Sequence, residues 1–272
     1  MKLEGRWKFF GIVFLIIYLL FSLLPIAWVF VSSFKTHYQT LIMPPKLFFK
    51  PTITAYKNVF LGGMGKVFLN STKVAVIDIL AAMVFGIPAA YSLARFKSKV
   101  TENIGFWLLS LRMAPAFGVV IPVYILMRRF HLLDTTVAVN AAHLLINIPF
   151  AVWLLKSYIE EIPVEIEESA LVDGATRFQT LVHIILPVSM PMVVTVAILI
   201  FIFSWNELFF AFVLTSSEGM TVPVLVASLA GSMTFNWPLL CAISVCSMVP
   251  AFVFAFVVQR HIVRGLTLGA IR

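Results

Sequence analysis

Charged residues are scarce in this chain. Of its 272 residues, 12% are Asp, Glu, Lys or Arg, whereas 61% are hydrophobic, and the mean hydropathy is +1.02. In soluble domains about a quarter of the residues are charged. The shortage of charge therefore excludes an ordinary soluble domain and predicts an integral membrane protein.

Cysteine and clustered metal ligands are scarce too. The two cysteines, Cys241 and Cys246, share one apolar run, and their spacing suggests neither a disulfide framework nor a metal site. The sequence also has no cluster of His, Cys and Asp residues, and it has no nucleophile with a base nearby. A membrane-bound enzyme is therefore disfavoured, and we expect no metal, no cofactor and no catalytic residue in this chain.

A phosphate-binding loop is missing as well. The run Gly62–Lys66 ends in Gly-Lys like such a loop, but its leading glycine is misplaced and Val67 stands where Ser or Thr would hold magnesium. We interpret this run as a turn outside the membrane. If ATP drives this protein, the nucleotide and its magnesium are expected on other subunits.

Long uncharged runs dominate what is present, and a helix needs about 20 apolar residues to cross a bilayer. The first run is longer than the apolar part of a signal peptide, and no small-residue cleavage site follows it, so we interpret it as a retained anchor. The sequence thus predicts an all-α membrane protein with six transmembrane helices. These are Phe9–Val31, Val67–Leu93, Ile104–Met127, Val137–Leu155, Val188–Leu214 and Leu239–Val258.

An even number of spans places both termini on one side of the membrane. With the termini inside, 11 Lys and Arg residues lie in inner segments and 7 in outer loops. This bias favours cytoplasmic termini, and it explains the net charge of +8 better than nucleic-acid binding does. We expect an N-terminal anchor and outer loop over residues 1–66. A five-span core over residues 67–272 then includes a cytoplasmic loop, 156–187.

Within that loop, the 163–187 segment predicts two short helices joined by a fixed turn. Pro163 suits a helix start, and the glutamates that follow favour the positive end of the helix dipole. Asp173-Gly174 predicts the end of the first helix, since glycine adopts the left-handed cap easily. Thr176 can start the second helix, with Phe178 on its apolar face, and Pro187 is expected to end it.

An acidic helix is a poor ligand for an anionic bilayer surface, which attracts Lys and Arg instead. Docking into a groove of a soluble partner fits the 163–187 segment better than lying on the membrane does. Small side chains at Ser169, Ala170 and Ala175 allow such a partner to approach closely.

The spacing within this segment resembles a known signature. Glu168-Ser169-Ala170 is followed after three residues by Gly174, and after nine more by Ile184, Leu186 and Pro187. This resembles the coupling loop of permease subunits of ATP-binding-cassette importers, with Ser169 where the family usually has alanine. The resemblance implies that Glu168, Ser169, Ala170, Asp173, Gly174, Ala175, Phe178, Ile184, Leu186 and Pro187 contact an ATPase subunit.

Three further stretches are similar to carbohydrate-uptake permeases of the maltose-permease type, specifically the smaller of two permease partners. They are Ala89–Phe96, Ser204–Glu207 with the residues up to Ser217, and the tail Gln259–Arg272. The likeness runs from about Asn70 to the C-terminus.

This likeness implies a second permease, two cytoplasmic ATPases that bind ATP and magnesium, an extracytoplasmic solute-binding protein, and a sugar or polyol as substrate. It also implies a multi-pass protein of a bacterial or archaeal cytoplasmic membrane. The alternative is an autonomous ion-coupled secondary transporter, in which Asp78, Arg112 and Glu207 relay protons.

Polar residues inside the predicted spans form the second candidate site, because ionisable groups in a bilayer are costly and mark function by default. Asp78 and Arg112 allow three interpretations. They pair with each other, they line the solute path, or the Arg112 side chain extends toward the cytoplasm. The stripe Asn140, His143 and Asn147 lines a path or, more commonly, makes interhelical hydrogen bonds. The possible substrate-path residues are Asp78, Arg112, Asn140, His143, Asn147, Asn206 and Glu207.

Overall fold

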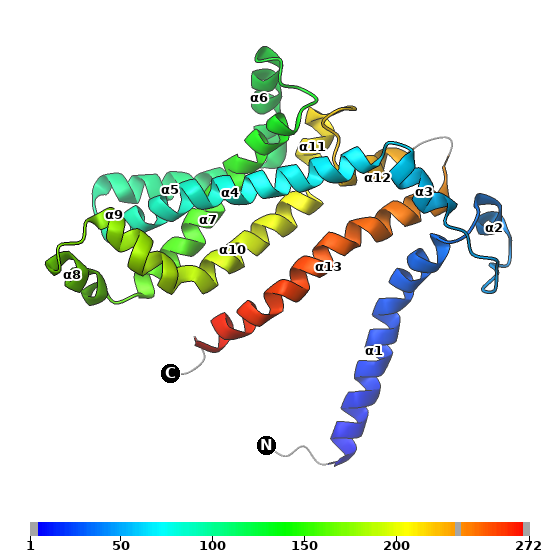
Figure 1. Ribbon diagram of the computed structural model, residues 1–272, viewed down its shortest axis with the longest axis horizontal. Helices are drawn as coiled ribbons and strands as arrows, with labels where there is room; N and C mark the ends of the chain where they lie inside the picture. Colours follow the sequence, from blue (N-terminus) through cyan, green and yellow to red (C-terminus); the bar gives the residue numbers. More distant parts are fainter. Residues whose placement is uncertain (1–4, 232–234, 269–272) are drawn as a thin grey trace. The chain divides into compact units, whose positions relative to one another are not determined.

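The computed structural model describes residues 5–231 and 235–268, and within them the chain is helical without strands. This confirms the all-α prediction. The elements (Figure 1) are α1 Gly5–Ser32, α2 His37–Leu41, α3 Thr54–Leu61, α4 Gly65–Arg95, α5 Lys99–Met113, α6 Ala116–Arg129, α7 Thr136–Glu161, α8 Val164–Val172, α9 Arg177–Thr180, the π-helical turn η1 Leu181–Ile185, α10 Leu186–Asn206, α11 Phe209–Leu214, α12 Val222–Ala230 and α13 Trp237–Leu268.

Five helical stretches in the described residues are long and apolar enough to cross a membrane, and the bent pair α5 and α6 makes a sixth if it counts as one span. The five stretches are Trp7–Ser32, Gly65–Arg95, Thr136–Glu161, Arg177–Asn206 and Trp237–Phe254. In α1 the large apolar side chains are exposed, as expected where a bilayer or another subunit covers the helix.

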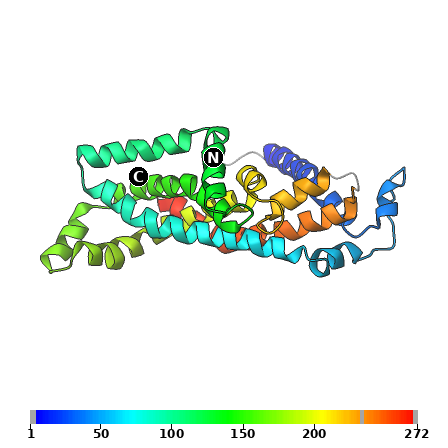
Figure 2. The ribbon, with the colours of Figure 1, turned by 90° about the horizontal axis from the view of Figure 1, so that it is seen from above.

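The prediction of one continuous span over Ile104–Met127 is wrong in its geometry. Two helices, α5 and α6, meet here at an angle of 97°, and Figure 2 shows α6 turned sharply away from α5. Pro115 is the N-cap residue of α6, and Ala114 before it has extended backbone angles. Proline disfavours the helical conformation in the preceding residue, so the apolar run breaks here although its composition suits a span.

The predicted fifth span, Val188–Leu214, also ends earlier than expected, because α10 stops at Asn206 and a separate α11 follows. Glu207 lies between the two helices, and its carboxylate accepts hydrogen bonds from the backbone N–H groups of Phe210 and Ala211. These donors have no partner inside α11, so the carboxylate stabilises a new helix start in an otherwise apolar run.

The chain divides into two compact units. The first contains Met1–Lys66 and Val226–Val249, and the second contains Val67–Leu225 and Pro250–Arg272. The sequence boundary at residue 66 thus coincides with a unit boundary, whereas residues 226–249 group with the N-terminal unit. Both candidate sites lie in the second unit.

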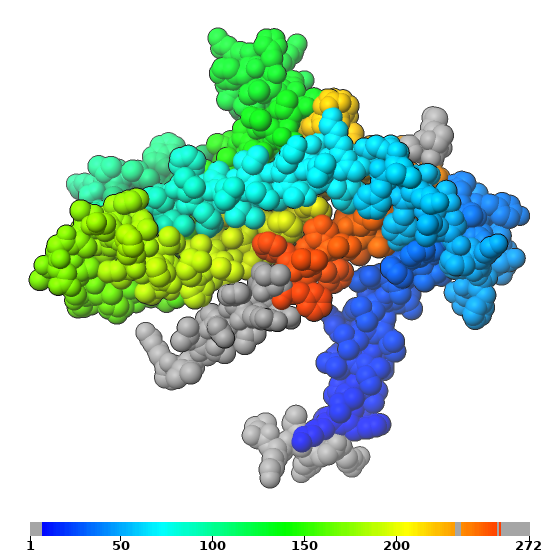
Figure 3. Space-filling model, viewed as in Figure 1, coloured from blue at the N-terminus to red at the C-terminus, as the bar shows by residue number. Residues whose placement is uncertain are grey.

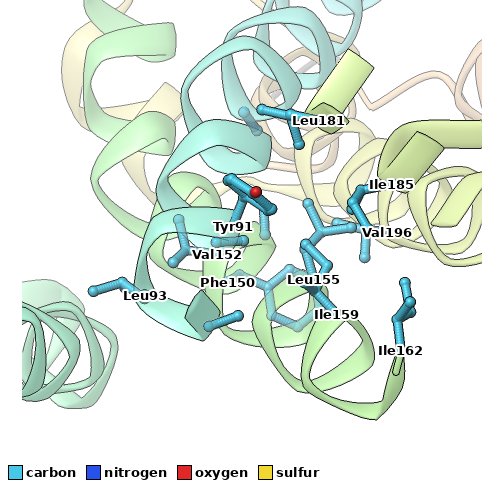
Figure 4. Packing of buried hydrophobic residues seen from close by; sticks show 14 of the residues in the cluster. Tyr91, Leu93, Phe150, Val152, Leu155, Ile159, Ile162, Leu181, Ile185 and Val196 are labelled. Atoms are coloured by element: carbon cyan, nitrogen blue, oxygen red, sulfur yellow. The ribbon is translucent and has the colours of Figure 1, made fainter. Parts of the chain in front are cut away.

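The second unit has an apolar core where α4, α7 and α10 pack together. Leu155 and Ile159 of α7 are fully buried there with Ile185 of η1 and Ile200 of α10. Figure 4 shows Leu155, Ile159, Leu181 and Ile185 gathered beside Tyr91 of α4. The core therefore lies directly next to the 163–187 segment.

Candidate functional site

The 163–187 segment contains the two short helices that the sequence predicts. Helix α8 ends at Asp173, and Gly174 follows with a φ of 88°, the left-handed conformation that glycine adopts without strain. Thr176 and Gln179 then form a capping box, in which each side chain accepts a hydrogen bond from the other residue's backbone N–H. The turn between α8 and α9 is fixed by local chemistry.

The second short helix does not stop at Pro187, contrary to the prediction. It continues from α9 through η1 into α10, with the N–H of Leu186 bonded to the carbonyl of Leu181. The wider π-helical turn shifts the hydrogen-bond register just before Pro187, which has no N–H and stands in the first turn of α10. The segment is therefore continuous with a membrane-spanning helix.

Most of the predicted ATPase-contacting residues are accessible. Figure 3 shows α8 and α9, in yellow-green, at one end of the second unit. The side chain of Phe178 is 72% exposed and that of Val172 is 87% exposed. Exposed are Glu168, Ser169, Asp173, Gly174, Phe178 and Pro187, and half-buried are Ala170, Ala175, Ile184 and Leu186.

Glu167, next to the signature glutamate, points inward and is fully buried. Its carboxylate accepts hydrogen bonds from Arg95 Nε at 2.6 Å and from the Tyr91 hydroxyl at 2.9 Å. Both partners come from the end of α4, so this contact joins α8 to a membrane helix. The sequence gives no signal for these partners of Glu167, because they lie on a distant helix.

The second candidate site is a buried polar cluster between α4, α7 and α10. Asp78 of α4 is fully buried, and its carboxylate accepts hydrogen bonds from Asn140 at 2.7 Å and from Ser204 at 2.6 Å. His143 Nδ1 lies 2.7 Å from the same carboxylate. Asn147 Nδ2 donates to Ser204 at 3.1 Å. The polar stripe on α7 thus makes interhelical hydrogen bonds, as one of the two sequence interpretations expects.

His143 connects two carboxylates. Its Nε2 lies 3.0 Å from Glu207 Oε2, while its Nδ1 faces Asp78. An imidazole protonated on both nitrogens donates to both carboxylates at once. Such a ring neutralises part of the negative charge that two buried carboxylates bring into the membrane.

Arg112 does not pair with Asp78, which already has its partners on α7 and α10. Its guanidinium lies 4.1 Å from the ring centre of Phe150 and 5.8 Å from that of Phe203. Within the described residues it makes no hydrogen bond and no ion pair. A cation over two aromatic faces keeps its five N–H donors for another acceptor.

A cavity of about 110 Å³ adjoins both the cluster and Arg112. Its polar lining includes His143, Asn147 and Glu207, and its apolar lining includes Phe203 and Phe210. The Oδ1 atom of Asn147 accepts no hydrogen bond from any described residue. The cavity therefore offers free donors on Arg112 and a free acceptor on Asn147, between aromatic walls.

Three of the predicted path residues do not line this cavity. Asp78 and Asn140 lie behind it, bonded to each other, and Asn140 Nδ2 also donates to the carbonyl of Val74. Asn206 is exposed, and its side chain donates to the carbonyl of Ile202 on its own helix. Trp205, next to Asn206, is buried and stacks on Phe201.

A carboxylate that the sequence analysis missed, Asp134, connects two loops. It has a positive φ of 58° and accepts hydrogen bonds from the backbone N–H groups of residues 216–219 and from the Ser217 hydroxyl. A Cβ atom on Gly219 would lie 2.8 Å from the backbone of Asp134 and Thr135, so only glycine fits there. A single aspartate in a loop has no sequence signal for this role.

The structure describes part of the tail Gln259–Arg272. The structure describes the backbone of α13 as far as Leu268, whereas residues 269–272 are outside the described residues. Among the described residues no group of three His, Cys, Asp or Glu side chains has a geometry suited to a metal ion.

Relatives of known class resemble the chain over nearly its whole length. The probable ABC transporter permease protein y4oR of Sinorhizobium fredii is 32% identical over 98% of this chain and 95% of its own length. The trehalose transport system permease protein SugB of Mycobacterium tuberculosis is 33% identical over 93% of each chain.

A solved structure has the same fold. One chain of a bacterial ABC transporter involved in the import of the acidic polysaccharide alginate superposes with a TM-score of 0.79 at 26% identity, covering 96% of this chain and 99% of that one. Residues 82–268, which include the 163–187 segment and the residues that line the cavity, match the family model described as binding-protein-dependent transport system inner membrane component. The chain therefore belongs to the family of inner-membrane permease components of binding-protein-dependent ABC importers.

Proposed function

We propose that this chain is a permease subunit of an ATP-driven importer for a sugar or polyol, and that it forms half of the solute path. The observation that carries the proposal is the exposed, acidic α8–α9 segment, which is continuous with α10 and matches the coupling-loop spacing. The trehalose and alginate transporters among its relatives favour a carbohydrate as the transported class. They give no support to an autonomous ion-coupled transporter.

The partners follow from this role. A second permease completes the path, and two ATPase subunits bind ATP and magnesium on the cytoplasmic side. A solute-binding protein delivers the substrate from outside. The 163–187 segment then faces the cytoplasm, both termini lie on that side, and the membrane is the cytoplasmic membrane of a bacterium or archaeon.

Docking at α8 and α9 has a physical basis in the exposed side chains. Val172 and Phe178 have exposed apolar side chains. A partner that covers them removes apolar surface from water, which favours binding. Glu168, on the same helix as Val172, adds an exposed negative charge that is suited to a cationic group of the ATPase. The left-handed turn at Gly174 holds the two short helices in one arrangement, so a partner displaces them together.

The cavity beside Arg112 is our proposed part of the solute path. Sugars are bound by planar polar groups with aromatic neighbours, and here the guanidinium of Arg112, the amide of Asn147 and the carboxylate of Glu207 lie beside Phe203 and Phe210. Small-molecule sites usually measure about 300–1,000 Å³. At about 110 Å³ this cavity holds part of a solute, and the partner permease supplies the rest.

Purification from the native membrane tests the proposal. The tagged chain is extracted in a mild detergent, and the proteins recovered with it are identified by mass spectrometry. Recovery of a second permease and an ATPase is expected. A chain that is recovered alone, and that transports in liposomes without ATP, contradicts the importer role.

A further inference from the structure

The end of α4 and the start of α8 are joined by buried polar contacts. Arg95, the last residue of α4, donates from Nε to Glu167 Oε1 and from Nη2 to the carbonyl of Ile162 at 2.9 Å. The side chains of Arg95 and Glu167 are 7% and 0% exposed. Since Ile162 is the C-cap of α7, one guanidinium binds both sides of the α7–α8 junction.

This arrangement holds α8 more firmly than a surface ion pair would. Water screens an exposed pair, whereas removing one partner of a buried pair leaves an uncompensated charge without solvent. The Tyr91 hydroxyl binds the second oxygen of Glu167, so both carboxylate oxygens have a donor on α4. Helix α8 therefore cannot swing or slide relative to the end of α4 without breaking these bonds.

Neighbouring carboxylates on α8 lack such contacts. Glu165 and Glu168 are exposed, and their side chains make no hydrogen bond or ion pair within the described residues. Two adjacent glutamates, Glu167 and Glu168, thus have different surroundings, since Glu167 contacts α4 and Glu168 is exposed. The signature residue Glu168 is placed to meet a partner, and Glu167 is placed to connect α8 to the membrane helices.

We propose that Arg95, Glu167 and Tyr91 are positioning residues that transmit a displacement of α8 to α4. This inference rests on the proposed ATPase docking and adds the route by which docking moves a membrane helix. A rigid contact transmits motion because the buried pair has one well-bonded arrangement, whereas α8 without it is attached through the α7–α8 junction and the turn at Gly174.

Spin labels at the two ends of this contact test the proposal in the purified complex with its ATPase. The labels are attached singly, at Asp173→Cys on the α8 cap or at Lys97→Cys just after α4, in a background with Cys241→Ser and Cys246→Ser. Both sites are exposed. In the otherwise unchanged chain, ATP with vanadate is expected to alter the spectra of both labels.

With Glu167→Gln, the label at Asp173 is expected to respond still, whereas the response at Lys97 is lost while ATP hydrolysis continues. Glu165→Gln, on the same helix and exposed, is the matched control and leaves both responses intact. If these residues served only folding, Glu167→Gln would reduce recovery of the complex, and the two labels would still respond alike in the complex that is recovered. Responses at both positions in Glu167→Gln overturn the proposal.

A second variant covers the case in which Glu167→Gln does not assemble. The double variant Arg95→Gln with Glu167→Gln has no buried unpaired charge, and it is expected to assemble and to lose the response at Lys97. A retained response there also overturns the proposal. If neither label responds in the unchanged chain, the failure lies with the proposed ATPase docking instead.

Discussion

Single buried carboxylates explain much of how this chain is held together, because each joins elements far apart in the sequence. Asp78 accepts bonds from residues of α7 and α10, and Glu167 accepts bonds from residues of α4. A buried donor that loses its acceptor costs about 1–3 kcal/mol. Substitutions at these positions therefore have effects that exceed those at exposed carboxylates.

Asp78→Ala is expected to lower stability by about 3 kcal/mol or more, because it leaves donors of Asn140, His143 and Ser204 without an acceptor. The change is measured by heating the detergent-purified protein and monitoring the loss of its monodisperse peak in size-exclusion chromatography. Asp78→Asn, which keeps an acceptor oxygen, should lose less. An unfolding temperature for Asp78→Ala equal to that of the unchanged protein contradicts this assignment.

Asp134 gives stability a dependence on pH. Partial burial opposes its charge, yet hydrogen bonds from four backbone N–H groups outweigh burial and hold the pKa of Asp134 well below its usual range. Because the folded pKa lies below the unfolded value of about 4, the stabilisation is complete above pH 4 and is lost as the pH falls further.

Replacing Asp134 with Asn, which also tolerates a positive φ, is expected to cost about 1–2 kcal/mol at pH 7, since the site is partly open to solvent. Unfolding temperatures of the unchanged protein and of Asp134→Asn are measured at pH 7 and at pH 3. The difference between the two temperatures is expected to be smaller at pH 3. A difference that does not change with pH would show that the charge of Asp134 is not involved.

Among the elements, the α8–α9 pair was predictable from sequence and the breaks within the membrane helices were not. Proline and glycine at 163 and 174 act locally, so their effects follow from the neighbouring residues. The break at Pro115 lies in a run whose composition suits a span, and prolines such as Pro88 and Pro149 remain inside helices. Whether proline ends a helix depends on packing that the sequence does not display.

Gly174→Val is expected to reduce transport while leaving the chain in the membrane. A side chain there meets no atom within 4 Å, so the defect comes from the left-handed backbone, which costs a β-branched residue about 1–2 kcal/mol. ATP hydrolysis by the purified complex, stimulated by its binding protein, measures the loss. Gly174→Asn, which accepts a positive φ, is the matched control and should retain function. Equal function of Gly174→Val and Gly174→Asn contradicts this explanation.

Glu168→Lys tests the same element through its charge. The side chain is exposed, so folding should be unchanged, while a cationic group on the ATPase would be repelled. Recovery of the ATPase with the tagged chain is expected to fall by about tenfold, equivalent to about 1.4 kcal/mol. Unchanged recovery together with normal uptake would exclude a docking role for Glu168.

For the whole molecule, composition and spacing predict the class and the family, whereas the buried contacts at both candidate sites join residues that are far apart in the sequence. Glu167 and Arg95 are 72 residues apart, and nothing in their local sequence distinguishes Glu167 from Glu168. The same holds for Arg112. From the sequence it pairs with Asp78, lines the path or extends toward the cytoplasm, and in the structure it lies over Phe150 and Phe203. Long-range partners are set by helix packing.

The membrane topology makes a prediction at this scale. In right-side-out vesicles, a membrane-impermeant maleimide is expected to label Ser216→Cys and to label Asp173→Cys only after permeabilisation, both in a background with Cys241→Ser and Cys246→Ser. Both positions are exposed in the structure. Labelling of Asp173→Cys in sealed vesicles would place the 163–187 segment outside and contradict docking to a cytoplasmic ATPase.

The central claim is that the exposed α8–α9 segment meets the ATPase, and photo-crosslinking from that segment tests it most directly. A photoreactive residue replaces Phe178, whose side chain is 72% exposed, and the control carries the same residue at Ser216. We predict that light joins the chain to the ATPase from position 178 and not from position 216. An assembled complex in which position 178 yields no crosslink to the ATPase would contradict the account.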